Sequence, residues 1–441
     1  MTTRRQALKL LLGAGAIGAV NAEAPLSLKF SSPTAKAQMG TGGKTLIKVF
    51  LRGGADGINL FPPYTDNAYY QVRPDLAVAP PNGNDASSAI QLTADMGAHP
   101  ALAPLMEIWD NGDLALAPAT HMAGTGRSHF DNQRWIENGI IDNNANGYLG
   151  RFVDINQSNA TFPALVAGRS GVAQVLRGRT PVTAIRDRSS FSISDRLWCS
   201  GDDCSDNRYL SMLRRLNESA PQGASPAERQ AYEKALDMSE KLELVANLSD
   251  DYTPDAGGLT YSNDGFGNGL EITAQLIKAG VGLEVVAMDW SIGWDTHSGQ
   301  LPNNVDHGDL NFRYHSRIRE GANNMLAFYR DIADRRDDVL MIFGTEFGRT
   351  VRQNGSRGTD HGAAAAWWMI GGAVNGGVRT AWPGLAENQL ENGRFLATSL
   401  DYRDMLGEAL VSFLGAPQSQ LADIFPGHSF SSANLINATG S

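Results

Sequence analysis

Nearly continuous apolar segments alternate with amphipathic segments along most of the 441-residue chain. Segments such as 45–51, 283–288 and 339–343 are rich in β-branched and large apolar residues, which is typical of strands buried on both faces of a parallel sheet. Apolar residues three and four positions apart from Ile318 to Ile332 predict a long amphipathic helix. This alternation predicts an α/β fold, a three-layer α/β/α sandwich whose mainly parallel sheet has helices on both faces.

Further elements follow from the same patterns and from signals at helix ends. Residues 225–228 (SPAE) read as a capping box with proline at the first helical position, which predicts the start of a helix. We expect one domain over residues 44–415, an irregular or helical insertion at about 168–262, and a C-terminal tail over 416–441. The other expected elements are strands at 113–119 and 163–167 and helices at 99–109, 128–138, 225–248, 270–278 and 401–414.

The first residues have the pattern of an export signal. Arg4 and Arg5 precede a short apolar run, Leu10 to Val20, that is rich in glycine and alanine. This order is typical of a cleaved leader, and the paired arginines resemble a twin-arginine signal. We therefore expect residues 1–37 to be a signal peptide and linker, and the folded protein to be exported to the periplasm or the cell exterior. A membrane-anchoring helix is the alternative, although the run is short for a span.

Composition narrows the class of partners. The formal net charge of −10 argues against nucleic acid or an anionic membrane surface as the main partner. No apolar run is long enough to cross a bilayer, so we expect no integral membrane segment in the mature chain. Cys199 and Cys204 are close together, and in an exported protein this spacing suggests a local disulfide, with a partial metal site as the alternative.

Acidic and histidine side chains follow several of the expected strands. The carboxyl ends of parallel strands meet at one edge of the sheet, where ligands bind. Asp, Glu and His without cysteine suit a divalent ion such as Zn, Mn or Mg. Structural roles are the alternatives, with Asp56 capping a glycine turn and the Asp–His pairs hydrogen-bonded within loops. His307 is expected to be a loop or helix-cap residue. The expected metal ligands are Asp56, Asp295, His297, Glu346, Asp360 and His361.

Ser128 opens the helix expected at 128–138 and has two interpretations. It fits an N-cap serine, which has only to start the helix. A hydroxyl at a helix N-terminus also lies where backbone N–H groups favour an anion, and a nearby metal ion would make it a nucleophile. The guanidinium groups of Arg127, Arg349 and Arg352 could clamp an oxyanion or form surface salt bridges. The candidate additional ligands or supporting groups are His121 and His129.

Five motifs in order along the chain resemble a known family. The segments are FLRGGADGIN at 50–59, RSHFD at 127–131, WDTH at 294–297, GTEFGRT at 344–350 and DH at 360–361. With the leader, they resemble the bacterial exported family known as domain of unknown function 1501, related to the alkaline phosphatase and sulfatase superfamily. That relation implies an alkaline-phosphatase-like α/β/α sandwich, one or two divalent ions at the carboxyl edge of the sheet, and hydrolysis of phosphate or sulfate esters.

The resemblance also implies roles for single residues. Asp56 resembles the ligand after the first strand, and Ser128 resembles the nucleophile at a helix start. Phe347 departs from the superfamily pattern, because it stands where a histidine would follow the acid at Glu346. The second ion is therefore either absent or completed by Asp360. The other residues that match ligand positions are Asp295, His297 and His361.

Two functions follow from these observations. The first is an exported metal-dependent hydrolase that acts on phosphate or sulfate esters, either small molecules or polymers, with Ser128 as the nucleophile and Arg127 and Arg349 as oxyanion binders. The alternative is a non-catalytic exported binding module that retains a vestigial metal site. Phe347 and the two interpretations of Ser128 favour the alternative, and the concentration of ligand side chains at strand ends favours the hydrolase.

Overall fold

The computed structural model describes two compact units. One comprises residues 208–248, and the other comprises the described residues of 43–190 and 251–437. The described part of the chain is residues 43–83, 85–191, 208–248 and 251–437.

The large unit is built on a mixed, mostly parallel sheet. Its strands follow the order β10-β4-β9-β8-β1-β7-β5-β6, with β11 paired to β4. Strand β9 runs antiparallel to both β4 and β8, and the other pairs in this sheet are parallel. The strands are β1 Thr45–Phe50, β4 Leu114–His121, β5 Phe162–Ala167, β6 Thr183–Ile185, β7 Leu283–Asp289, β8 Val339–Gly344, β9 Ala365–Ile370, β10 Gly377–Val378 and β11 Leu400–Asp401, and β2 Ile90–Gln91 pairs separately with β3 Gly97–Ala98.

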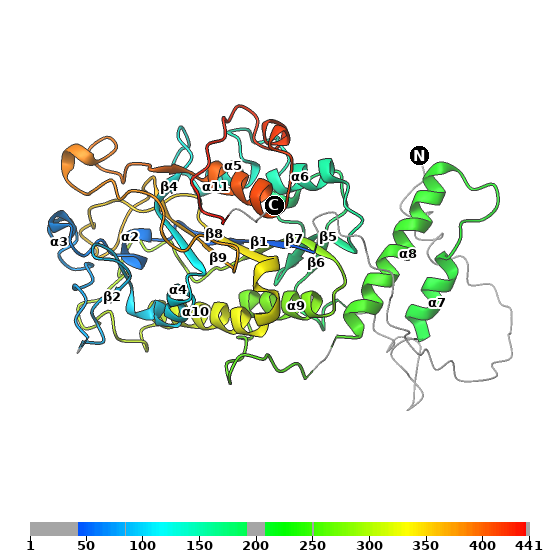
Figure 1. Ribbon diagram of the computed structural model, residues 1–441, viewed down its shortest axis with the longest axis horizontal. Coiled ribbons are helices and arrows are strands. Elements are labelled where there is room, and N and C mark those ends of the chain that lie inside the picture. The colour runs from blue at the N-terminus through cyan, green and yellow to red at the C-terminus, as the bar shows by residue number, and fades with distance from the viewer. Residues whose placement is uncertain (1–42, 84, 192–207, 249–250, 438–441) are drawn as a thin grey trace. The chain divides into compact units, whose positions relative to one another are not determined.

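Helices cover both faces of this sheet. Figure 1 shows α9 and α10 on one face and α5, α6 and α11 on the other. The result confirms the predicted α/β class and the mainly parallel sheet. The α-helices are α2 Gly57–Leu60, α3 Asn67–Val72, α4 Met106–Asp110, α5 His129–Asn138, α6 Tyr148–Asn156, α7 Arg208–Asn217, α8 Pro226–Ala246, α9 Gly265–Lys278, α10 Arg313–Asp331, α11 Tyr402–Glu408 and α12 Leu421–Ile424.

Most elements form where the hydrophobic pattern predicts them. All six residues of β1 and of β8 are buried, as expected for central strands covered on both faces. In the smaller unit, Ser225 and Glu228 make the predicted capping box at the start of α8. The helix expected at 99–109 is instead a 3₁₀ helix, Pro100–Leu105, that continues into α4. Pro104 explains the difference, because it cannot donate the backbone hydrogen bond that an α-helix needs there.

The topology brings four loops to one edge of the sheet. Strands β1, β7 and β8 are parallel neighbours. Strand β4 points in the same direction, because β9 lies between β4 and β8 and runs antiparallel to both. The loop after β1 turns sharply at Gly53 and Gly54, whose φ angles are 127° and 71°. At Gly54 an added Cβ would lie 2.7 Å from the Phe347 ring, so the close packing there requires glycine. The segments after β1, β4, β7 and β8 therefore lie at a common edge.

The segment after residue 415, expected as a tail, packs on the large unit. Leu435 and Ile436 are buried in the same core cluster as the central strands. The buried carboxylate of Glu408 accepts hydrogen bonds from the backbone N–H groups of Ala433, Leu435 and Ile436 at 2.6–2.9 Å. One acid in α11 therefore holds the end of the chain against the core.

No helix of the described residues is long and apolar enough to cross a membrane. The leader at 1–37 and the two cysteines, Cys199 and Cys204, lie outside the described residues. The expectations of export and of a local disulfide therefore stay predictions.

We predict that Glu408→Ala loosens the C-terminal segment. The substitution leaves three backbone N–H groups without their acceptor, and we expect the free energy of unfolding to fall by about 3 kcal/mol. Denaturant unfolding measures this loss, and limited proteolysis should cleave the variant within 416–437. Asp423→Ala, at an exposed residue of the same segment, is the control and should change the free energy of unfolding by less than about 0.5 kcal/mol. Equal stability of the two variants would contradict the prediction.

Candidate metal centre

Three side chains from different loops bring ligand atoms together at the carboxyl edge of the sheet. His129 is the first residue of α5 after β4, Asp295 lies in the loop after β7, and His361 lies in the loop between β8 and β9. Their ligand atoms all lie within 4.8 Å of one another. Asp295 Oδ1 is 3.4 Å from His129 Nε2 and 3.1 Å from His361 Nε2. The sequence predicted Asp295 and His361 as ligands, and it left His129 open between an additional ligand and a supporting group.

His297 adjoins this group on its exposed side. Its Nε2 atom is 3.0 Å from His361 Nε2 and 3.1 Å from Asp295 Oδ1. Because both Asp295 and His297 reach the same point, the short spacing of the WDTH motif suits two ligands of one ion. The structure therefore brings together three of the six predicted ligands, Asp295, His297 and His361, and adds His129.

The second nitrogen of each imidazole faces an oxygen acceptor. His361 Nδ1 lies 2.8 Å from the backbone oxygen of Arg127, which can only accept a hydrogen bond, so Nδ1 carries the proton. His129 Nδ1 donates to Glu346 Oε1 at 2.6 Å. His297 Nδ1 lies 3.2 Å from Asp360 Oδ1. Neutral imidazoles held in this way direct an Nε2 lone pair towards the Asp295 carboxylate, which is how metal-binding histidines are held in proteins.

The donor atoms fit a bound cation. Metal–nitrogen bonds of about 2.1 Å place neighbouring ligand atoms roughly 3 to 3.5 Å apart, and the three Nε2 atoms lie 3.1–3.4 Å from Asp295 Oδ1. His129 Nε2 is buried and has no hydrogen-bond partner in the described part of the chain. Lone pairs and a carboxylate oxygen that face one point repel each other unless a positive charge lies between them. The arrangement therefore suits a divalent ion.

The carboxylates of the centre are held in their charged form. Burial on its own raises the pKa of Asp295, but the hydrogen bond and the positive charge of Arg349 outweigh it and lower the pKa to about 2. Burial likewise opposes ionisation of Glu346, and hydrogen bonds from His129 and Gln133 lower its pKa overall. The hydrogen bond to Glu346 raises the pKa of His129. Negative charge therefore persists beside the histidines at neutral pH.

Glu346 supports a ligand and does not belong to the group of ligand atoms. Its carboxylate is wholly buried and accepts hydrogen bonds from His129, from Gln133 Nε2 at 2.9 Å and from the Gly53 backbone at 2.9 Å. Asp360 has a similar part, because it faces His297 Nδ1 and also lies 3.5 Å from Arg394. Both acids therefore orient histidines.

Arg349 is also placed to hold the site together. Its side chain is wholly buried, and it donates to the backbone oxygens of Gly53, Gly54 and Trp294 as well as to Asp295 Oδ1 at 2.7 Å. A guanidinium group that is buried and bonded in this way cannot reach a substrate. The structure thus gives Arg349 a positioning role in place of the oxyanion contact expected from the sequence.

Asp56 lies apart from the ligand group. It is wholly buried, and its Oδ2 atom accepts hydrogen bonds at 2.7 Å from both Arg73 Nη1 and Gln300 Nε2. Arg73 continues to the backbone oxygens of Thr350 and Val351. This buried ion pair joins the loop after β1 to the loop after β8. The Asp56 carboxylate, which was expected to be a metal ligand, therefore makes a structural contact.

Ser128 and Arg127 lie beside the centre on the chain that carries His129. Ser128 is exposed and occupies the N-cap position of α5, but its side chain does not cap the helix. The backbone oxygen of Arg127 contacts His361, and the Arg127 guanidinium stacks on Phe395 at 3.6 Å. The hydroxyl of Ser128 is therefore not committed to the capping role that the sequence allowed.

Phe347 packs against the ligand histidines. Its buried ring lies 4.8 Å from the His129 ring and 4.6 Å from the His361 ring, measured between centroids. The histidine expected as the partner of Glu346 comes instead from α5, as His129. The phenylalanine that departs from the superfamily pattern thus forms an apolar backing for a centre completed from elsewhere in the chain.

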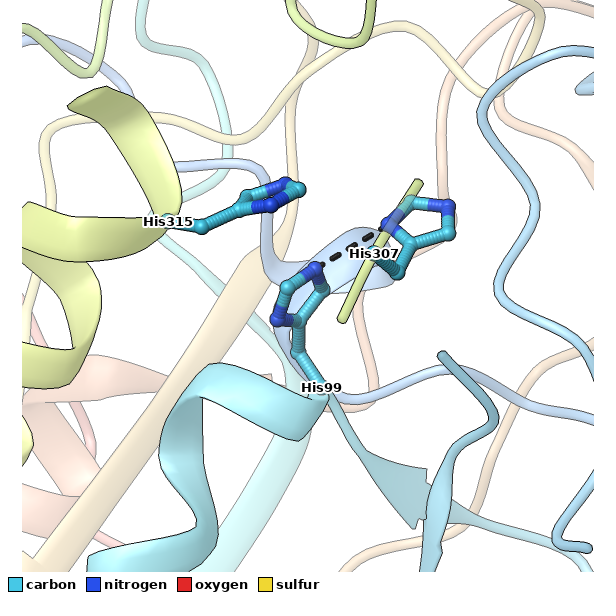
Figure 2. A group of neighbouring side chains, drawn as sticks. All are labelled: His99, His307 and His315. Atoms are coloured by element: carbon cyan, nitrogen blue, oxygen red, sulfur yellow. Dashed lines mark hydrogen bonds between the residues drawn. The ribbon is translucent and has the colours of Figure 1, made fainter. Parts of the chain in front are cut away.

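A second group of histidines meets the same distance criterion but has the wrong hydrogen bonds for a metal ion. Figure 2 shows His99, His307 and His315, all of them buried. His99 Nδ1 accepts a hydrogen bond from the Ala101 N–H at 3.1 Å, so a neutral His99 carries its proton on Nε2 and donates it to His307 Nδ1 at 3.1 Å. A metal on His99 Nε2 would displace that proton and leave Nδ1 facing a donor. Within the group, His99 and His307 share this hydrogen bond, whereas His315 Nδ1 faces the backbone oxygen of Asp309 at 3.2 Å.

Comparison with known proteins supports the resemblance read from the motifs. A family model described as "Protein of unknown function (DUF1501)" matches residues 43–422. The matched region includes every residue of the candidate metal centre. No curated protein matches the chain.

We predict that Asp56→Asn lowers stability and leaves metal binding intact. Removing the charge leaves the buried Arg73 guanidinium without its counterion, which should cost about 3–5 kcal/mol of unfolding free energy. Denaturant unfolding measures that loss, and elemental analysis of the folded variant should give the same metal content as the wild type. Asp295→Asn is the matched comparison and should lose the ion. Loss of the ion from Asp56→Asn at unchanged stability would identify Asp56 as a ligand.

We predict that acid destabilises the protein partly through the buried histidines. Burial lowers the pKa of His99, His307 and His315, and that of His307 to about 4. The unfolded state therefore binds more protons below about pH 6.5, so the free energy of unfolding falls as the pH drops from about 6.5 to 4, by up to ~1.4 kcal/mol per pH unit for each histidine. In His307→Gln, the change in the free energy of unfolding per pH unit should be smaller than in the wild type by the contribution of one proton. Equal slopes for variant and wild type would contradict the prediction.

Proposed function

Because this chain belongs to the DUF1501 family, whose description assigns no activity, we propose its function from the site itself: a metal-dependent hydrolase of phosphate or sulfate esters. The proposal includes a relation to the alkaline phosphatase and sulfatase superfamily and export of the folded protein. One observation carries it. The Nε2 atoms of His129, His297 and His361 turn towards Asp295 Oδ1, while their Nδ1 atoms are held by oxygen acceptors.

The donor set favours one ion and narrows its identity. In the described residues, a single group combines imidazole nitrogens with a carboxylate in the tautomers that a metal requires. Imidazole nitrogen suits Zn and is a poor donor for Mg, which prefers oxygen ligands. We therefore favour Zn, with Mn as the alternative, bound by His129, Asp295 and His361 with His297 beside them. The ion would supply positive charge that favours an ionised nucleophile and offsets charge on the reacting ester.

Ser128 is the proposed nucleophile. It follows Arg127, whose backbone oxygen contacts His361, and precedes His129, so its backbone lies between two contacts to the centre. Its exposed hydroxyl is not used to cap α5. Attack by the Ser128 Oγ atom on phosphorus or sulfur would form a serine ester and release the alcohol, which takes up the serine proton. Water would then hydrolyse the serine ester, release inorganic phosphate or sulfate and regenerate the hydroxyl.

The remaining residues support this reaction by position and charge. Glu346 and Asp360 orient His129 and His297 through their Nδ1 atoms. Arg349 fixes Asp295 at 2.7 Å and cannot itself touch the substrate. The Arg127 side chain is 37% exposed, stacks on Phe395 and forms a long 3.9 Å ion pair with Glu391, so the edge of its guanidinium remains able to contact an anionic ester.

We predict one ion per chain and loss of both ion and turnover in His361→Ala. Removing one imidazole and its hydrogen bond should lower metal affinity at least tenfold, because each ligand of such a site contributes strongly to binding. Elemental analysis and thermal unfolding with added Zn or Mn measure the effect. His428→Ala, at a histidine in the C-terminal segment, is the control and should retain the ion. Wild-type protein that neither contains metal nor gains stability from it would contradict the proposal.

We predict that Ser128→Ala retains the ion and loses ester turnover. The substitution removes only an exposed hydroxyl, so folding and metal content should not change, whereas kcat for p-nitrophenyl phosphate or p-nitrophenyl sulfate should fall at least 100-fold. The measurement is release of p-nitrophenol by metal-loaded protein. Turnover that survives in Ser128→Ala would exclude the serine mechanism. Metal binding without turnover of any ester by the wild type would favour the non-catalytic binding module.

A further inference from the structure

A groove opens beside the metal centre, and Asp360 belongs to both. The cavity volume is about 670 Å³, which lies in the range of small-molecule sites. Asp360 lines the groove and lies 3.2 Å from His297 Nδ1 through its Oδ1 atom. A ligand whose reacting group reaches the metal centre can therefore extend into the groove.

The groove has an apolar floor. Val72, Val351 and Leu385 line it and belong to a small core cluster, and the partly buried Leu390 packs against that cluster. These side chains come from α3, from the loop after β8 and from the segment between β10 and β11, so the floor is fixed by packing across three parts of the chain. Such a surface suits the carbon skeleton of a ligand.

Two arginine side chains, Arg352 and Arg394, also line the groove. Arg352 is exposed, and its guanidinium has no ion pair or hydrogen bond with any residue that the structure describes. The side chain of Arg394 is 58% exposed, lies 3.5 Å from Asp360 and has its guanidinium 5.5 Å from the centre of the Phe395 ring. Asp360 is shared with His297 and Asn354, so it does not neutralise both arginines. The remaining acid of the groove is the exposed Glu387.

We infer that the substrate is an ester with a second anionic group, a phosphate, sulfate or carboxylate, that lies in the groove against Arg352 and Arg394. An organic link on the apolar floor joins this group to the ester at the metal centre. The inference rests on the proposed function, because the metal centre holds the reacting end. The second anion explains why two guanidinium groups face a groove in a protein that is acidic as a whole.

The test measures binding and does not depend on turnover. Isothermal calorimetry compares glycerol 1,3-bisphosphate with glycerol 3-phosphate, and the bissulfate with the monosulfate, on the full-length Ser128→Ala chain supplied with Zn, so that no ligand is hydrolysed during the titration. We expect the ligand with two anionic groups in at least one pair to bind about fivefold more tightly, the gain typical of a charge contact in a partly exposed site. A preference in one pair identifies the anion. Equal affinities within both pairs would overturn the inference.

Charge variants test whether the charged residues of the groove cause this preference. In Arg352→Gln the ratio of affinities should fall towards one, and in Glu387→Gln it should rise above the wild-type value, since an opposing charge is removed. Arg335→Gln is the matched control, because Arg335 precedes β8 and lies at the opposite edge of the sheet. An equal fall in Arg335→Gln would reveal an effect of net charge alone and overturn the inference. Preference for the ligand with two anionic groups, without turnover of any ester by the wild type, would uphold the groove and reject the hydrolase.

Discussion

A buried positive charge holds the functional edge of this protein together. The cost of burying the Arg349 guanidinium is offset by hydrogen bonds that it donates to backbone oxygens in the loops after β1 and β7, and to the Asp295 carboxylate. Because an unpaired buried charge is very unfavourable, these loops can adopt their positions only together. The buried pair of Arg73 and Asp56 repeats the device between the loops after β1 and β8. The buried charges of Arg349 and of the Arg73–Asp56 pair thus hold the loops that carry the candidate ligands.

Hydrogen-bond polarity separates the two histidine groups of the molecule. Both bring three ligand atoms within the same distance of one another. At the sheet edge the far nitrogens face acceptors such as Glu346, whereas His99 faces a backbone donor in its own turn. Proximity alone therefore does not identify a metal site. The tautomer imposed by the second nitrogen decides whether a lone pair is available.

The sequence was informative where local patterns determine structure. Apolar runs located the central strands, and strand-end placement located Asp295, His297 and His361. The roles of Asp56 and Arg349 could not be read in this way, because each depends on a partner far away in the chain, such as Arg73 for Asp56. The role of His129 was left open for the same reason, since its hydrogen bond to Glu346 spans 217 positions. The RSHFD motif at the start of α5, which contains His129, was the sequence signal that could have identified it.

The dispersion of the site along the chain has a consequence for how the protein folds. Each histidine of the metal centre is oriented by a residue from another loop, and the contacts span 217, 63 and 234 positions. Contacts of such long range form only after the entropy of closing large loops has been overcome, so they belong to the last stages of folding. No short segment of the chain carries a preformed site. These side chains therefore come together only when the sheet that carries their loops has formed.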